Sequence, residues 1–143
     1  MAITYENVIY DRVIESLHSL LANEFSIPIH FDEHEGNQSF LITPDTDTLI
    51  EYAANSQTRT YGLNISYQLM ASGNYTKNVI KQVTGMTERL KRLLFNNSAY
   101  SPSDSYKWHD GRVQSISYSR NEDDSSIIAS EVSFECTVGE VIG

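Results

Sequence analysis

Two long segments of the chain alternate between apolar and polar residues, and a helical pattern lies between them. The first segment runs from Arg59 to Ala71 and the second from Ile127 to Val138. Alternation of this length predicts two β-strands, each with one face in the core and one in solvent. The residues predicted on the buried faces are Tyr61, Leu63, Ile65, Tyr67, Leu69 and Ala71, then Ile128, Val132, Phe134, Cys136 and Val138.

Two further segments show the three-to-four-residue spacing of amphipathic helices. Tyr5 to Glu24 carries a single apolar stripe, and Thr4 is placed to cap its first turn. Tyr75 to Phe95 carries a second stripe, made of Val79, Val83, Met86, Leu90 and Leu94 and widened by Ile80 and Leu93. Gly85 lies inside this second helix at a cost of about 1 kcal/mol relative to alanine, which indicates a close packing contact.

Three short strands are predicted between the first helix and the first long strand. Pro28 places the segment Ile27 to Asp32 at a sheet edge or at a strand start. Ser39 to Thr43 is the second, ended by Pro44 and the acidic cluster at residues 45–47. Leu49 to Ala54 is the third, with a helix as the alternative, and residues 55–58 form the turn of a hairpin with the long strand.

The region after the second helix predicts a loop followed by a hairpin. Asn96 to Asp104 is polar and contains a proline, which is typical of a loop. Tyr106 to Trp108 and Arg112 to Ser119 are predicted strands around the turn Asp110-Gly111. Arg120 to Ser126 is predicted to be an acidic hairpin tip before the last strand.

Runs of strands, rather than regular βαβ alternation, indicate an α+β fold. We predict a mostly antiparallel sheet with two amphipathic helices packed on one face. The length of 143 residues fits a single domain, which we place at residues 1–138, with residues 139–143 as a C-terminal tail. The sequence contains no apolar run of about 18 residues, so no membrane-spanning helix is predicted.

Acidic residues outnumber basic residues 19 to 10, giving a net charge of −9. A dedicated DNA- or RNA-binding protein needs lysine and arginine against the phosphate backbone, so that class is disfavoured. An acidic surface beside nucleic acid repels the phosphates instead. The single cysteine, Cys136, lies on an alternating strand and is predicted to be a small core residue, which fits a reducing compartment.

Candidate chemistry is sparse. The segment 30–35 contains metal-ligand types, but in an extended chain His30 and His34 would lie about 13 Å apart at roughly 3.3 Å per residue. The segment Asp45 to Asp47 opens like a calcium loop, yet Leu49 stands where a third oxygen ligand is needed. No GxSxG, Walker A or GxGxxG motif is present. We therefore expect no metal, no cofactor and no enzymatic activity.

Basic residues are concentrated on the second predicted helix, which holds five of the ten in the chain: Lys77, Lys81, Arg89, Lys91 and Arg92. Lys77, Lys81 and Arg92 share one side, opposite much of the apolar stripe. This side is either an ordinary solvated face or a docking surface for an acidic patch on a neighbour, including another copy of the chain.

Tyrosines provide a second indication of an interface. Tyr52, Tyr100, Tyr106 and Tyr118 are expected to be partly exposed, and exposed tyrosines with few charges around them suit protein–protein contacts. The ordinary preference of strands for aromatic residues is the alternative explanation. We add Tyr52 and Arg59 to Lys77, Lys81 and Arg92 as candidate interface residues.

Three stretches together carry a family resemblance over most of the chain. The first is a helix followed by short strands, Tyr5 to Ile42. The second is the alternating strand TRTYGLNISYQL at residues 58–69, which continues into the helix that ends at Phe95. The third is the acidic tip at residues 118–124 followed by the strand ASEVSFECTV at residues 129–138. In this order they resemble the tail-terminator (tail-completion or neck) proteins of long-tailed bacteriophages, which are small α+β proteins.

The resemblance implies a virion structural protein that forms a homo-oligomeric, hexameric ring at the head-proximal end of the tail tube. Its partners would be other copies of itself, the tail tube protein and the head connector or stopper protein. DNA would pass through the lumen without specific binding. The protein would act in host cytoplasm during assembly and then in the tail or neck of the virion. A strand edge or hairpin, Leu49 to Ala71, would be covered by the neighbouring subunit.

Two alternatives to a tail terminator stay open. The first is another neck, head-completion or tail tube protein. The second is a small-ligand-binding or enzymatic α+β domain, which would show a pocket with converging polar groups.

Overall fold

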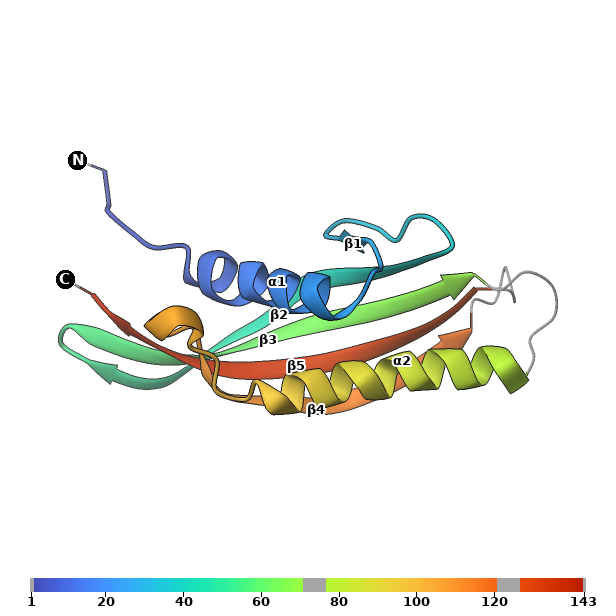
Figure 1. Cartoon of the computed structure of the whole chain (residues 1–143). Helices are drawn as coiled ribbons and strands as arrows, with labels where there is room; N and C mark the ends of the chain where they lie inside the picture. The colour runs from blue at the N-terminus through green and yellow to red at the C-terminus, as the bar shows by residue number, and fades with distance from the viewer. Residues whose placement is uncertain (1, 71–76, 121–126, 143) are drawn as a thin grey trace.

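The computed structural model describes residues 2–70, 77–120 and 127–142. In these residues the chain forms the following elements (Figure 1): a π-helical turn Ile9–Ile14, α1 Glu15–Glu24, β1 Ile29–His30, β2 Gln38–Ala53, β3 Ser56–Met70, α2 Lys77–Asn96, a 3₁₀ turn Pro102–Asp104, β4 His109–Arg120 and β5 Ile127–Val141. The strands form one sheet in the order β1-β2-β3-β5-β4. Only β1 and β2 run parallel; the other neighbours are antiparallel.

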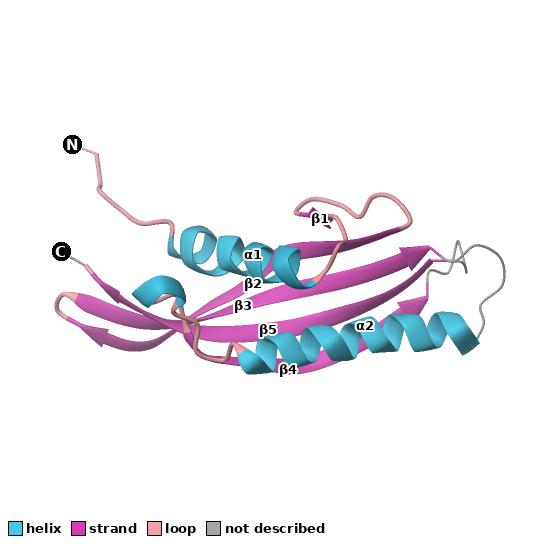
Figure 2. Cartoon of the chain, in the orientation of Figure 1, coloured by secondary structure: helices cyan, strands magenta, loops and turns pink. Residues whose placement is uncertain are grey.

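The molecule has two layers, with both helices on the same face of the sheet (Figure 2). This confirms the predicted α+β class and the placement of the helices. The other face of the sheet carries no helix in the described residues, which explains why its strands keep polar residues at every second position.

The two long alternating strands are neighbours at the centre of the sheet. β3 and β5 pair antiparallel over their whole length, so that Leu63 stands beside Phe134 and Ile65 beside Val132. The predicted inward faces of β3 and β5 are buried wherever they are described; Ala71 lies outside the described residues. Cys136 is fully buried, as predicted, and burial raises the pKa of its thiol to about 12.

α2 packs with its apolar stripe on β4 and β5 and, less extensively, on β3. Val83, Leu90 and Leu94 are buried against the sheet. Thr87 is also buried, and its hydroxyl lies 2.7 Å from both the Val83 carbonyl and the Ser130 hydroxyl of β5, so polar groups at this contact are paired. The close contact predicted at Gly85 is wrong, because a Cβ atom built there would meet nothing within 4 Å.

The first helix begins later than the predicted Tyr5. Residues 2–7 are exposed and non-helical, and the first helical turns are π-helical. Asn7, rather than Thr4, contacts the first turn: its side-chain oxygen accepts a hydrogen bond from the Tyr10 amide at 3.4 Å. Tyr5 remains 81% exposed, so no packing against the core extends the helix to it.

β2 is one strand where the sequence predicts two strands and an acidic turn. Pro44 and the following acidic cluster lie at a shift of register between residues 44 and 46, and a second shift lies between Leu49 and Glu51. A bulge at an edge tolerates proline, which has no N–H to donate. Gly62 of β3 lies opposite Thr46 of β2, and the Thr46 side chain would clash with a Cβ atom at position 62. The helical alternative for residues 49–54 is therefore wrong.

The predicted strand Tyr106 to Trp108 is also wrong. Trp108 forms only an isolated bridge with Tyr100, and its fully buried ring stacks on Tyr100 and packs edge-on against Phe134. The predicted turn Asp110-Gly111 lies inside β4 as an irregularity. Gly111 lies in a tight position there, because a Cβ atom would lie 3.0–3.1 Å from atoms of Trp108, Phe134 and Ser98 and would require them to shift slightly.

The C-terminal end of β5 differs from the prediction. β5 continues to Val141, so Gly139 to Val141 belong to the sheet rather than to the predicted tail, and they pair with Ser56 to Thr58 of β3. The predicted acidic tip falls largely on residues 121–126, which lie outside the described residues.

β1 is shorter than predicted and lies at the sheet edge, as Pro28 indicated.

Truncating Leu90 to alanine should destabilise the fold by about 2–5 kcal/mol, because it removes a fully buried side chain between α2 and the sheet. The measurement is the free energy of unfolding from urea titration followed by circular dichroism. Ile80→Ala on the same helix is the control, since Ile80 is 42% exposed and should cost under about 1 kcal/mol. Equal losses in the two variants would contradict this packing.

Candidate assembly surfaces

The clearest unpaired surface is the far end of the β2–β3 hairpin. We call residues 45–53 of β2 and 56–60 of β3 the hairpin arm. Every β2 residue from Pro44 to Ala53 is exposed, whereas the first half of the strand is buried or half-buried. Figure 1 shows the arm extending past the start of α1, so neither helix covers it.

The hairpin arm exposes large apolar side chains. Leu49 is 47% exposed, Ile50 59% and Tyr52 75%, and Val141 at the adjacent end of β5 is 79% exposed. The exposure predicted for Tyr52 is confirmed. Single exposed apolar residues are normal, but several on one projecting element are typical of a contact surface.

One edge of the arm has no strand beside it. β1 pairs only with Phe40 and Leu41, so among the described residues β2 has a single neighbour, β3, from Ile42 onward. An edge of this length presents unpaired backbone N–H and C=O groups, which natural proteins cover or blunt. The arm therefore combines an open edge with exposed apolar residues.

Charge on the arm is mainly acidic. Arg59 donates to the Asp47 carboxylate at 3.0 Å and to the Gln57 side chain at 2.9 Å. The bond to Asp47 joins β3 to β2, whereas the bond to Gln57 lies within β3. Asp45 and Glu51 are exposed and form no ion pair within the described residues. Arg59, a candidate interface residue, is thus half-buried and already paired within the arm.

Tyr52 and Arg59 lie on the same face of the arm. Tyr52 pairs with Gln57 and Leu49 pairs with Arg59, so the two candidates occupy neighbouring register positions on adjacent strands. The structure therefore brings these two predicted residues together, and it adds Leu49 to them. In a regular strand Leu49 and Tyr52, three residues apart, would face opposite sides. The register shift between Leu49 and Glu51 places them on one face, and the sequence gives no sign of that shift.

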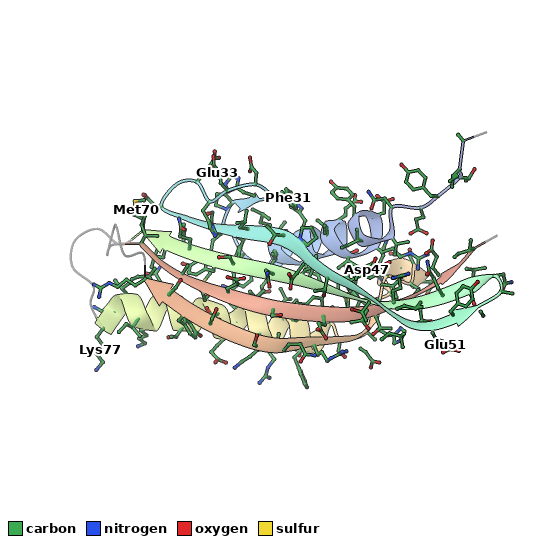
Figure 3. The ribbon with its side chains drawn as sticks, turned by 180° about the vertical axis from the view of Figure 1, so that it is seen from behind. Phe31, Glu33, Asp47, Glu51, Met70 and Lys77 are labelled. Atoms are coloured by element: carbon green, nitrogen blue, oxygen red, sulfur yellow. The ribbon has the colours of Figure 1, made fainter. Side chains whose placement is uncertain are left out.

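The other three candidates lie on α2, away from the arm. Lys77, Lys81 and Arg92 are exposed and form no ion pair among the described residues. The other two basic residues of this helix are paired, Arg89 with Glu24 and Lys91 with Glu88. Figure 3 shows Lys77 and Glu51 at opposite ends of the molecule, so the predicted interface residues form two separate groups.

Phe95 is a surface residue that the sequence analysis did not single out. It is 74% exposed near the end of α2. It borders a hollow of about 360 Å³ lined by Lys91, Phe95, Ser98, Gly111, Arg112 and Val113. A second hollow lies on its other side, along Glu88, Arg89 and Arg92. The sequence feature that could have pointed to Phe95 is its position directly after Leu94, the last residue of the apolar stripe.

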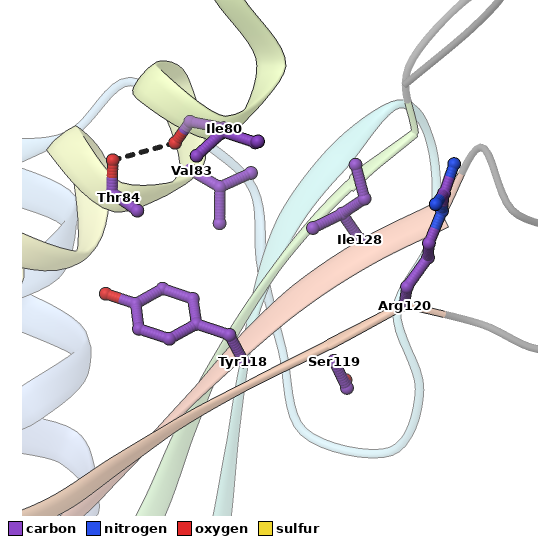
Figure 4. Close-up of a pocket in the computed structure, with 7 residues that line it drawn as sticks. All are labelled: Ile80, Val83, Thr84, Tyr118, Ser119, Arg120 and Ile128. Carbon is purple, nitrogen blue, oxygen red and sulfur yellow. Dashed lines mark hydrogen bonds between the residues drawn. The ribbon is translucent and has the colours of Figure 1, made fainter. Parts of the chain in front are cut away.

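A cleft of about 270 Å³ lies between the start of α2 and the end of β4 (Figure 4). It is lined by Ile80, Val83, Thr84, Tyr118, Ser119, Arg120 and Ile128. The Thr84 hydroxyl donates to the Ile80 carbonyl, so it is already bonded within the helix. The cleft offers mainly apolar contact, and Arg120 is its one ionisable lining residue besides Tyr118 among those described.

The histidine segment forms internal bonds. The two ring nitrogens of His34 lie 2.6 Å from the Ser39 hydroxyl and 3.0 Å from the Ser66 hydroxyl. His30 lies 3.8 Å from the Glu35 carboxylate. Burial lowers the pKa of His34, and the nearby His30 lowers it further. No group of three or more potential metal ligands occurs within residues 2–70, 77–120 and 127–142.

A comparison with protein-family models finds no match to this sequence, and a comparison with curated proteins also finds none. None of the helices in the described part of the chain combines the length and apolar character needed to span a bilayer. The case for function rests on the surfaces themselves.

Stability should fall as pH drops below about 6.5, because His34 has a lower pKa in the folded state than its ordinary 6.5. The unfolded chain then binds the proton first, so stability is full above that pH and is lost toward the folded pKa. The measurement is the urea midpoint between pH 7.5 and pH 5. His34→Gln should flatten this slope, with His18→Gln as the control for losing another imidazole. An unchanged slope in His34→Gln would contradict the assignment.

Proposed function

We propose that this protein is a virion structural subunit of the tail-terminator type. In this role copies form a ring at the head-proximal end of a phage tail tube and join it to the head connector. The fold class agrees with the small α+β architecture that the family resemblance implies. The proposal treats the protein as non-enzymatic, because its exposed features are contact surfaces rather than converging catalytic groups.

The observation that carries the proposal is the hairpin arm. Its apolar side chains and open edge project beyond the helices, so the chain's own described residues do not cover them. Burying them against another copy removes apolar surface from water and covers the edge. A projecting arm on one side and a receiving surface on another is the arrangement of a head-to-tail contact, which closes into a ring when the rotation allows.

Charge supports the same role. With a net charge of −9, the protein gives DNA passing through a lumen little to bind. The unpaired basic side of α2, formed by Lys77, Lys81 and Arg92, is positioned to meet an acidic surface on an adjacent subunit or on the connector. The tail tube protein, the connector or stopper protein and other copies of this chain are the proposed partners.

The proposed location is the tail or neck of the virion, reached by assembly in host cytoplasm. A head-completion or tail tube protein is the runner-up, since it would use the same kind of self-association. The two roles differ in the partner that the assembled ring binds, the connector and tube end for a terminator and successive rings for a tube protein.

The wild-type chain should show a mass near a multiple of 16.2 kDa, and negative-stain images should show rings with an open lumen. The double variant Leu49→Asp and Tyr52→Asp should shift the protein to monomers with an unchanged circular dichroism spectrum, because it places charge on the arm's apolar surface. Light scattering after size exclusion across a concentration series measures this.

Phe31→Asp is the matched control for that experiment, since Phe31 is 45% exposed and Figure 3 shows it far from Glu51 on the arm. It should leave the mass unchanged. A wild-type protein that stays monomeric at every concentration would contradict the proposed ring. Assembly of the double variant would show that the arm takes no part in the subunit contact.

Reversing two charges on α2, Lys77→Glu with Lys81→Glu, should weaken assembly about tenfold, because an attraction becomes a repulsion. The measurement is the concentration at half-assembly in low and high salt. High salt should reduce the difference in half-assembly concentration between the variant and the wild type, since these side chains are exposed and their charges are screened. Lys107→Glu, outside α2, tests whether any loss of positive charge suffices. Unchanged assembly would reject an interface role for this end of α2.

A further inference from the structure

We propose that the open edge of the hairpin arm in one copy packs along the solvent-facing side of α2 in the next copy, with Glu51 against Arg92. The inference rests on the proposed ring and names the two surfaces that meet in it.

Apolar surface is exposed on both partners. Leu49 and Tyr52 provide it on the arm, and Phe95, at 74% exposure, provides it on α2 between two hollows. None of the three is covered by its own chain. Bringing them together places Phe95 against the arm and fills the adjoining hollow of about 360 Å³ with side chains of the neighbour.

The charged residues on the arm and on α2 are opposite in sign and similar in spacing. Asp45 and Glu51 lie six residues apart on β2, but with two register shifts between them they face only about four to five positions of β3, roughly 15 Å at about 3.3 Å per residue. Lys81 and Arg92 lie eleven residues apart on a helix, roughly 17 Å at about 1.5 Å per residue. All four are exposed and form no ion pair within the described residues. A contact between Glu51 of one copy and Arg92 of the next therefore also brings Asp45 near Lys81.

The two surfaces are also compatible in length and in hydrogen-bonding character. The exposed part of β2 from Asp45 to Ala53 runs beside residues 56–62 of β3, roughly 20 Å, and fits within α2 from Lys77 to Phe95, which spans roughly 27 Å. A helix laid along an open strand edge is one of the ways in which natural sheets cover such an edge. Lysine and arginine side chains on that helix can donate to the edge carbonyls.

The contact is between two different surfaces, so each copy keeps one of each free for the next. Figure 3 places Glu51 and Lys77 at opposite ends of the molecule. A contact of this kind is heterologous and continues from copy to copy until the rotation closes it. The same geometry that forms a ring thus explains why the arm and the basic side of α2 lie apart on one chain.

Disulfide trapping tests the contact directly. Chains carrying Tyr52→Cys are mixed with chains carrying Phe95→Cys, and oxidation should give a cross-linked dimer on a non-reducing gel. The native Cys136 does not compete, because it is fully buried. Either variant alone should give no dimer, since the contact is not symmetric. Phe31→Cys mixed with Phe95→Cys is the control and should also give none.

A charge exchange tests the register. Glu51→Arg or Arg92→Glu alone should raise the concentration at half-assembly about tenfold, and the two together should restore it to within about threefold of wild type. Both residues are exposed, so circular dichroism should show unchanged folding in all three variants. Recovery in the double variant is a result that general loss of charge would not produce.

The outcomes separate this inference from the ring itself. Rings that form in wild type without cross-linking in the mixed sample, and without an effect of either charge reversal, would overturn the arm-to-α2 contact and leave the ring standing. Cross-linking in the single variants would also overturn it, in favour of a symmetric dimer. A wild-type protein that never assembles overturns the ring and this inference together.

Discussion

The antiparallel pairing of β3 with β5 is the constraint on which the rest of the structure depends. It places two apolar faces side by side, from Leu69 beside Ile128 to Tyr61 beside Cys136. α2 packs over β5 and β4 on one side of this joint surface, and α1 with the π-helical turn before it packs over β1 and β2 on the other. The arm exists because β2 and β3 continue past the region that the helices cover, so the boundary between the core and the exposed arm is set by helix length.

The parts of the fold that the sequence predicts well are those governed by local periodicity. β3, β5 and α2 follow from alternation or from a helical stripe, and the fold class follows from their order. The part that fails is β2, because Pro44 and its acidic neighbours have the composition of a turn. Their position on an exposed edge removes the usual penalties, and only the pairing with β3 reveals this.

The candidate interface residues also divide into those that a local pattern predicts and those that it does not. Exposure of Lys77, Lys81 and Arg92 follows from helical geometry, and Tyr52 is exposed as predicted. That Tyr52 shares a face with Leu49 depends on the register of two strands, which no local pattern encodes. Phe95 was missed for a related reason: a single residue next to a stripe becomes conspicuous only when its surroundings are known.

Trp108 gives the molecule an internal reporter with useful selectivity. It is the only tryptophan in the chain, it is fully buried between Tyr100 and Phe134, and its indole nitrogen donates to the Asn97 carbonyl at 2.9 Å. Its fluorescence spectrum therefore depends on whether this part of the core is closed to water. Emission will therefore report the opening of this part of the core during unfolding, and it can be followed in an unlabelled sample.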